Sequence, residues 1–205
     1  VGSEMCIRDS LERMEEAKKR DHNKLGREME LFTTVDVIGQ GLPLMMPKGT
    51  KMIMKLQRWI EDLEDKEWGY VRTKTPLMAK SDLYKISGHW DHYKENMFPQ
   101  MEMDGESFVL RPMNCPHHMM IYANKLHSYK NLPIRIGEIA HDFRYEASGA
   151  VKGIERGRHF CQNDAHLFVT PEQIKSEFKG VIDLILDVYK DFNITDYRCV
   201  LSLRD

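Results

Sequence analysis

The sequence predicts an α+β fold in which helices flank a sheet built around one long hairpin. Ile139–His166 alternates with period two on both sides of a glycine-containing loop, which is typical of two antiparallel strands. Residues 50–69 and 170–192 place apolar side chains at helical spacing. Short alternating runs at residues 70–76 and 108–111 supply further strands.

Composition excludes several classes of protein. The 205 residues are 41% hydrophobic and 30% charged, as in one large globular domain with or without an appendage. A net charge of -2 gives no overall attraction to nucleic acid, so any RNA contact must come from local basic groups. No apolar run is long enough for a membrane span, and no secretory signal is visible. Four widely spaced cysteines predict reduced thiols in a cytoplasmic protein.

The amino-terminal part predicts two segments before the main domain. Residues 1–10 have no usable pattern, and we interpret them as an assembly artefact or a disordered end. Residues 11–32 are rich in Glu, Lys and Arg and predict a solvated linker helix. Their mixed charge favours a linker over a basic RNA-binding arm. Residues 33–205 are then the main domain.

A helix and a strand follow. Thr50 is expected to cap the helix and Gly69 to close it. The strand from Tyr70 ends at Pro76, which cannot donate to a ladder and so marks a strand end or a sheet edge. The pair could form a subunit interface, but spacing alone favours an ordinary helix packed on a sheet. The expected apolar face of the helix is Met52, Leu56, Trp59, Ile60 and Leu63.

Three helices are expected in the rest of the chain. Ser81 starts a short one, and residues 87–93 after it predict a surface loop with aromatics, in preference to a metal site at His89 and His92. Asn114 or Cys115 caps the second, which runs to about residue 129. It offers Met120, Tyr122 and Leu126 for packing.

Thr170 begins the third helix with a capping box, and its apolar stripe predicts core. Residues 197–203 predict another strand, and we expect the sheet to be completed by residues beyond Asp205. The stripe comprises Ile174, Phe178, Val181, Ile185, Val188 and Phe192.

One face of the hairpin carries the chemistry. Charged and polar residues are costly to bury unless they hold a ligand, so this face predicts the floor of an active site. The alternative is a structural Arg–Glu ladder across the two strands. The face holds Asp142, Arg144 and Glu146 on the first strand and Arg158, Phe160, Gln162, Asp164 and His166 on the second.

These residue types suit a nucleotide and a polar substrate. Arg144 can bind a phosphate, and Arg156 and Arg158 can reach the same phosphate or a neighbouring one. Phe160 can stack on a base, and Gln162 and Asp164 suit an amine or a hydroxyl. Cys115 and His166 are candidate zinc ligands, with His118 left open as a third; the alternative for Cys115 is an ordinary buried thiol.

Several motifs together resemble the catalytic domain of the threonyl-tRNA synthetases, which are class II aminoacyl-tRNA synthetases. The resemblance covers residues 16–205. It implies a mixed, mostly antiparallel sheet flanked by helices, truncated here at its carboxyl end. The motifs are Arg111-Pro-Met-Asn-Cys-Pro, Phe143-Arg-Tyr-Glu, Gly153-Ile-Glu-Arg-Gly-Arg-His-Phe, Gln162-Asn-Asp-Ala-His, Gly88-His-Trp-Asp-His-Tyr and Leu132-Pro-Ile-Arg.

The resemblance implies a role for each matching residue. Arg144 would contact the α-phosphate of ATP, Glu146 and Arg156 would hold the nucleotide, and Phe160 would stack on adenine. Cys115 and His166 would be two of three zinc ligands. The helix and strand ending at Pro76 would form a homodimer interface. Threonine would be bound by zinc and by Met113, Gln162 and Asp164.

The implied reaction has two steps: ATP activates threonine to threonyl-adenylate with release of pyrophosphate, and the threonyl group then passes from the adenylate to the 3′ end of tRNA(Thr), with Mg²⁺ on the ATP phosphates. A hydrophobic pocket separates threonine from valine poorly, whereas an open metal position requires the hydroxyl that valine lacks. The third zinc ligand and third class II motif are expected beyond Asp205, so we expect this chain alone to be inactive.

His117 stands where the family has a glycine. The alternatives are another class II synthetase, prolyl or seryl, and a non-catalytic synthetase-like binding protein.

Overall fold

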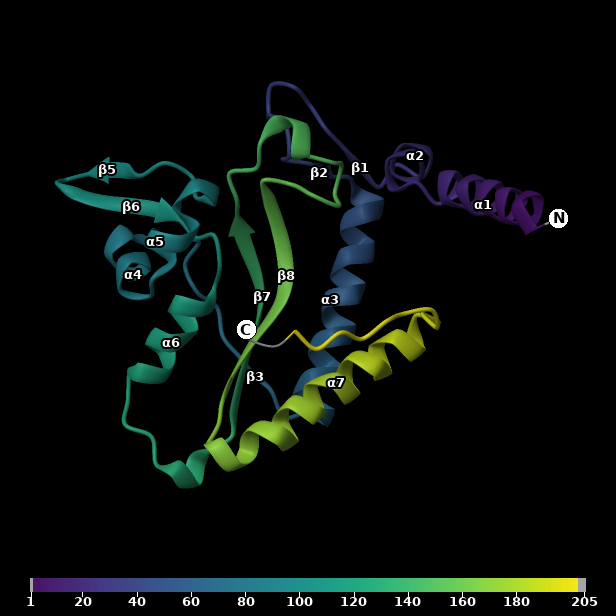
Figure 1. Cartoon of the computed structure of the whole chain (residues 1–205). Helices are drawn as coiled ribbons and strands as arrows, with labels where there is room; N and C mark the ends of the chain where they lie inside the picture. The colour runs from purple at the N-terminus through teal and green to yellow at the C-terminus, as the bar shows by residue number, and fades with distance from the viewer. Residues whose placement is uncertain (1, 203–205) are drawn as a thin grey trace.

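The computed structural model describes residues 2–202 and, for residues 2–9, the backbone alone. Its described part holds a central sheet of order β3-β7-β8, a second sheet of order β4-β6-β5 and a two-stranded pair, β1-β2 (Figure 1). The helices are α1 (Gly2–Lys19), α2 (His22–Glu28), α3 (Pro47–Glu67), α4 (Ser81–Ile86), α5 (His89–Tyr93), α6 (Cys115–Ala123) and α7 (Ile174–Asp191). The strands are β1 (Phe32–Thr33), β2 (Leu44–Met45), β3 (Val71–Arg72), β4 (Met78–Lys80), β5 (Met101–Met103), β6 (Glu106–Leu110), β7 (Ile134–Phe143) and β8 (His159–Phe168).

The long hairpin is confirmed as β7 and β8. They pair antiparallel from Ile134 opposite Phe168 to Phe143 opposite His159, so the hairpin is longer at its base than predicted. The first strand ends at Phe143, where the Arg144 amide turns to bond the Arg158 carbonyl. β3 pairs parallel with β7 at the sheet edge, which makes the sheet mixed and agrees with an edge position before Pro76.

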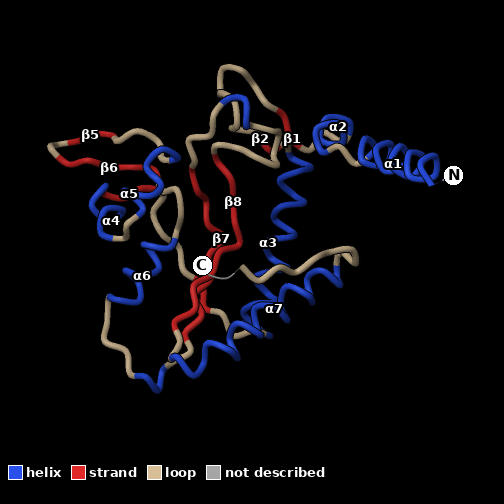
Figure 2. The backbone as a smooth tube through the Cα atoms, in the orientation of Figure 1, coloured by secondary structure: helices blue, strands red, loops and turns tan. Residues whose placement is uncertain are grey.

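The two faces of the hairpin meet different helices. One face, called the α6 face, carries Ile136, Glu138, Ala140 and Asp142 on β7 and Phe160, Gln162, Asp164 and His166 on β8. On the opposite face, the Asn163 amide donates to Glu64 of α3 at 2.6 Å, and Arg135 pairs with Glu177 of α7. Figure 2 shows the strands between α6 on one side and α3 and α7 on the other.

The amino-terminal helix was predicted wrongly as one segment. It starts at Gly2, ahead of residue 11, and a break at Asp21 divides it into α1 and α2. The break has a local cause, because the Asp21 carboxylate accepts the Lys24 amide at 2.8 Å and caps a new helix. α1 projects away from the other elements (Figure 1). The interpretation of residues 1–10 as artefact stays a prediction, and Val1 lies outside the described residues.

Helix α3 begins at Pro47, so the prediction of a Thr50 cap was wrong. Proline is well suited to the first helical position, because its missing N–H needs no partner there. Gly69, at φ +68°, closes the helix as predicted. The apolar face is only partly covered: Met52 and Leu56 are 48% and 44% exposed.

The prediction of a surface loop after α4 was wrong. That loop forms α5, whose Trp90 and Tyr93 pack against the buried cluster of Tyr84, Met97 and Val109. Burial of the two aromatic side chains therefore organises the segment as a helix.

The strand predicted at residues 108–111 is confirmed as part of β6, but β5 and the hairpin that joins it to β6 were missed, although the turn carries a clear signal. Asp104 and Gly105 have φ of +52° and +77°, the left-handed pair that Asp-Gly favours in two-residue turns.

Two helical predictions were wrong about packing. α6 ends at Ala123 and leaves Met120 and Leu126 exposed, while Tyr122 stacks on Phe168 at 4.0 Å. The α7 stripe was predicted as core, but only part of it is covered by the described sheet. The buried residue of α7 is Leu184, which is not one of the predicted stripe residues. The exposed positions of the stripe are Ile174, Phe178, Ile185 and Phe192.

The predicted strand at residues 197–203 is absent over the described positions 197–202, and residue 203 lies outside the description. Val200 and Leu201 are exposed there, and no ladder joins this segment to the described sheets. A strand needs a partner to satisfy its backbone groups, so alternation alone does not produce one.

Candidate active site

The base of the α6 face holds a buried ionic network. Arg111, Asn114 and Glu138 are each at most 3% exposed and come from three different segments. The Arg111 guanidinium lies 3.4 Å from the Glu138 carboxylate, which also accepts the Thr75 hydroxyl at 2.9 Å and the Asn114 amide at 3.1 Å. The charges are paired and their hydrogen bonds are made, as burial requires.

Hydrogen bonds decide the charge state of Glu138. Burial is the largest influence and raises the pKa of its carboxyl. The bonds from Thr75, His118 and Asn114 together outweigh burial and hold the pKa below its ordinary value. Glu138 is therefore an ionised carboxylate that anchors β7 to α6 and to the β3 segment.

Asp142, on the same face, is a buried carboxyl whose hydrogen bonds are not made within the described part of the chain. Its side chain is fully buried, and both oxygens lack a hydrogen-bond partner among the described residues. Burial raises the pKa of Asp142 to about 6, against the attraction of Arg111, whose Nε lies 3.4 Å away. The face thus contains a carboxyl that titrates close to neutral pH.

Towards the loop, Arg144 and Phe160 meet. The Arg144 guanidinium lies 4.9 Å from the Phe160 ring centroid and 5.7 Å from that of Tyr93. Its Nε donates a long bond of 3.5 Å to the Pro112 carbonyl. Cation–π contacts orient the guanidinium and leave hydrogen-bonding capacity for an anion.

The loop itself contains the Glu146–Arg156 pair. The two side chains are joined at 3.0 Å, with Glu146 14% and Arg156 60% exposed. Arg158 differs, because it donates to the Glu146 carbonyl, the Gln40 carbonyl and the Ser148 hydroxyl. Arg158 is therefore part of the scaffold, and Arg156 is the loop arginine that solvent and ligands can reach.

Gly41 holds this loop in place. The Gly41 carbonyl accepts the Arg158 amide at 2.7 Å, and a Cβ at Gly41 would lie 2.9 Å from that same nitrogen. Gly41 also has φ +77°, which side chains rarely adopt. A segment more than a hundred residues away thereby fixes the hairpin loop.

Cys115 begins α6, His166 lies near the end of β8, and Asp164 acts electrostatically on both of them. We call this group the α6 end of the face. Burial, with a contribution from Asp164, raises the pKa of the Cys115 thiol. Burial lowers the pKa of His166, which keeps its imidazole neutral. The His166 Nδ1 atom lies 2.8 Å from His118 Nδ1. Gln162 is exposed beside Asp164 on the same face, and Met113 is half-buried just ahead of α6.

The donor set suits zinc in kind. A thiol and a neutral imidazole are ligands that zinc prefers, and a bound cation would favour the thiolate. Among the described residues no group of three or more Cys, His, Asp and Glu has metal-binding geometry. His118 is fully buried, and both of its ring nitrogens contact protein groups, Nδ1 at 2.8 Å from His166 and Nε2 at 3.1 Å from Glu138.

The structure brings predicted residues together in three groups: Arg144 contacts Phe160, Glu146 pairs with Arg156, and Asp164 influences both Cys115 and His166. It also adds Arg111, Glu138 and their partners, which we did not predict. Extending the alternation back from Ile139 would have placed Glu138 on the polar face. The role of Arg111 has no local signal.

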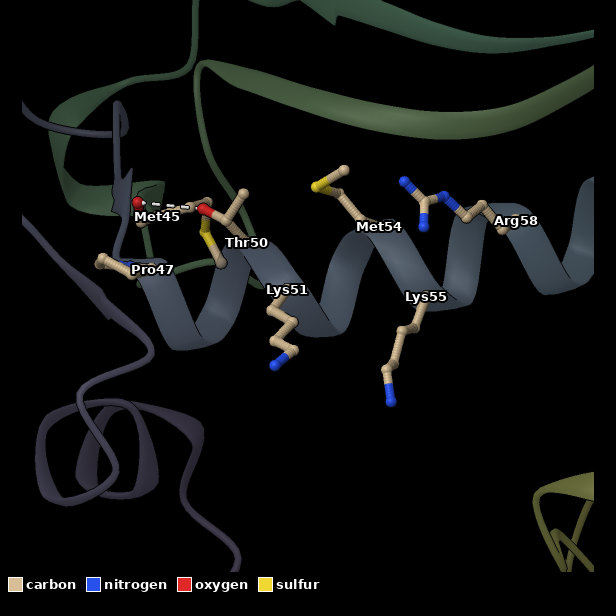
Figure 3. Close-up of a pocket in the computed structure, with 7 residues that line it drawn as sticks. All are labelled: Met45, Pro47, Thr50, Lys51, Met54, Lys55 and Arg58. Carbon is tan, nitrogen blue, oxygen red and sulfur yellow. Dashed lines mark hydrogen bonds between the residues drawn. The ribbon is translucent and has the colours of Figure 1, made fainter.

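A separate hollow of about 360 Å³ lies along α3 (Figure 3). Lysine and arginine side chains project from the helix beside it, together with methionines. No carboxylate, thiol or imidazole lines it, so it lacks groups for acid–base or metal chemistry. Its lining residues are Met45, Pro47, Thr50, Lys51, Met54, Lys55 and Arg58.

None of the described helices combines the length and apolarity that a membrane span requires. The described cysteine side chains Cys115, Cys161 and Cys199 are free thiols.

Comparisons with known proteins identify the family. Residues 97–205 match the model of the tRNA synthetase class II core domain (G, H, P, S and T). The chain is 60% identical over 192 residues to a threonine–tRNA ligase of Geobacillus kaustophilus, covering 94% of this chain and 29% of that protein. It is 57% identical over 199 residues to the threonine–tRNA ligase of Listeria monocytogenes, covering 97% and 31%.

A solved structure shares the fold. A crystal structure described as the RNA binding domain of threonyl-tRNA synthetase from Cryptosporidium parvum matches with a TM-score of 0.80 and 36% identity. The match covers 84% of this chain and 42% of that one. The chain spans about 30% of the length of the curated relatives.

Proposed function

We propose a function from one premise, namely that this chain belongs to the tRNA synthetase class II core domain family. It is part of a threonine–tRNA ligase, which activates threonine with ATP and transfers it to tRNA(Thr) during protein synthesis. One observation supports the proposal: Arg144 lies over Phe160, which shares a strand face with Asp164 and His166, and Asp164 acts electrostatically on both Cys115 and His166.

The loop end of the face would bind ATP. Arg144 is aimed by two aromatic rings and has the bidentate geometry that suits the α-phosphate, where negative charge develops during adenylate formation. Adenine would stack on the face of Phe160 that Arg144 leaves free. Glu146 and Arg156 would hold the nucleotide, and Mg²⁺ would accompany the phosphates.

The α6 end would bind threonine. Cys115 and His166 would hold zinc together with a third ligand outside the described residues. Zinc there would supply an open coordination position for the amino and hydroxyl groups of threonine. Asp164 and Gln162 would accept or donate hydrogen bonds to the same groups, and Met113 would line the pocket. Valine would be rejected because it lacks the hydroxyl.

The chain would pair with a second copy through α3 and β3. Exposed apolar side chains on α3, including Met52 and Leu56, and the free edge of β3 with its exposed Val71 support such an interface. Helix α7 adds exposed apolar surface that the rest of the enzyme could cover. Free thiols in the described part agree with a cytoplasmic location.

The decisive experiment is ATP–pyrophosphate exchange by the full-length protein that contains this chain. Exchange should require threonine, should persist partly with serine and should be weak with valine and proline. Arg144→Gln should lower it by about 100-fold, because a donor to the developing charge is lost. Arg27→Gln, an exposed substitution on α2, is the matched control and should have no effect.

Other outcomes would identify other functions. Exchange that depends on proline, or on serine in preference to threonine, would indicate a prolyl or seryl enzyme. Binding of ATP and threonine without any exchange would indicate a non-catalytic binding protein. Either result would overturn the proposal.

A further inference from the structure

His118 sits behind the proposed zinc ligand His166. The two Nδ1 atoms are 2.8 Å apart, and the rings meet edge to face with centroids at 4.8 Å. His118 is fully buried at the first turns of α6. Its other nitrogen, Nε2, faces the Glu138 carboxylate at 3.1 Å and the Thr73 hydroxyl at 3.2 Å. The two histidines and Glu138 therefore form one continuous chain of contacts.

The Glu138 carboxylate determines which ring nitrogen of each histidine carries the proton. Arg111, 3.4 Å away, pairs with Glu138 and keeps it an acceptor. His118 then carries its proton on Nε2 and donates it to Glu138. A neutral imidazole has one donor and one acceptor, so His118 Nδ1 accepts. His166 must therefore carry its proton on Nδ1, and the lone pair of its Nε2 is left free.

We propose that His118, supported by Glu138, is a positioning residue that fixes the ring and the tautomer of His166 so that Nε2 is the metal-binding atom. The inference rests on the proposed zinc site. Metal-binding histidines commonly donate their second N–H to a fixed acceptor, which orients the ring and raises its basicity. Here the acceptor is a second imidazole, and the carboxylate stands one residue further back.

One contact opposes this proton order. The Asn114 amide nitrogen lies 2.8 Å from His118 Nε2, and donation there would place the His118 proton on Nδ1. The same amide nitrogen lies 3.1 Å from Glu138, a charged and therefore stronger acceptor. Asn114 thus has an alternative partner, whereas the imidazole N–H has its best acceptor in the carboxylate.

Nitrogen-15 NMR of the histidine side chains in this 205-residue chain tests the order without any metal. His166 should show the Nδ1–H tautomer and His118 the Nε2–H tautomer. In His118→Leu, His166 should revert to the Nε2–H form that free histidine favours. His118→Gln should restore the Nδ1–H form, because its side-chain carbonyl can accept that proton. An Nε2–H tautomer of His166 in the unsubstituted chain would overturn the proposal.

Zinc affinity of the full-length protein, measured against a chromophoric chelator, provides the second readout. His118→Leu should weaken zinc binding by about 10- to 100-fold, and His118→Gln should recover most of the loss. His92→Leu, at an exposed position of α5, is the control. Unchanged affinity in His118→Leu together with zinc loss in Cys115→Ser would refute only the role of His118. Unchanged zinc in Cys115→Ser would refute the metal site itself.

Discussion

The two ends of the α6 face contrast in how their polar groups are satisfied. At the closed end, Arg111, Asn114, His118 and Glu138 are buried and bonded to one another. At the open end, Arg156 is exposed, and the half-buried Arg144 and Phe160 contact each other. Both ends are polar, so polarity alone does not identify a binding site. What distinguishes the open end is hydrogen-bonding capacity that the protein itself does not use.

The largest effect should follow from breaking the closed end. Arg111→Met removes the cation from two buried carboxylates, Glu138 and Asp142, and should cost about 3–5 kcal/mol of unfolding free energy. Urea unfolding of the chain measures it. Arg156→Met, at the open end, should change stability by less than about 1 kcal/mol. Equal losses in both variants would show that the two ends do not differ as described.

Asp142 lies between the two ends and should make stability depend on pH. Its carboxyl has a pKa of about 6 in the fold, raised from an ordinary 3.8. Between these values the folded chain holds a proton that the unfolded chain has lost, so stability falls as pH rises. Relative to the unsubstituted chain, Asp142→Asn should gain up to about 3 kcal/mol of unfolding free energy as the pH rises from 4 to 7.

Thermal unfolding of both proteins across that pH range checks this prediction. Asp36→Asn, an exposed substitution, should follow the unsubstituted chain at every pH. A stability difference between Asp142→Asn and the unsubstituted chain that stays constant over this pH range would mean that Asp142 is ionised across the range, as Glu138 is.

A smaller effect is expected at the open end itself. Phe160→Ala removes the ring proposed to stack on adenine and should raise the KM for ATP about 10-fold. Exchange assays on the full-length protein measure it, with the exposed Tyr129→Ala as control. If Phe160→Ala instead unfolds the protein and leaves the KM of the folded fraction unchanged, Phe160 belongs to the scaffold.

The sequence predicted features that depend on near neighbours better than it predicted the contacts of the closed end. Period-two alternation put Phe160, Gln162, Asp164 and His166 on one face, and the register confirms it. The Asn114 cap of α6 was also predictable from local spacing. Such features depend on neighbours along the chain.

The closed end depends on long-range contacts. Thr75, Arg111 and Glu138 come from separate segments, and only the folded topology makes them partners. Helix α7 illustrates a different limit. Its spacing identifies an apolar stripe correctly, but spacing does not say whether an element of the same chain covers it, and Phe178 is exposed.

Zinc content is the most direct test of whether the open end, together with the group of Cys115, Asp164 and His166, forms a metal-dependent active site. The full-length protein, purified without added metal and measured by atomic absorption, should contain about one zinc per chain. Cys115→Ser and His166→Ala should each lose it while remaining folded, and both should lose discrimination between threonine and valine. Full zinc occupancy in both variants would contradict the assignment.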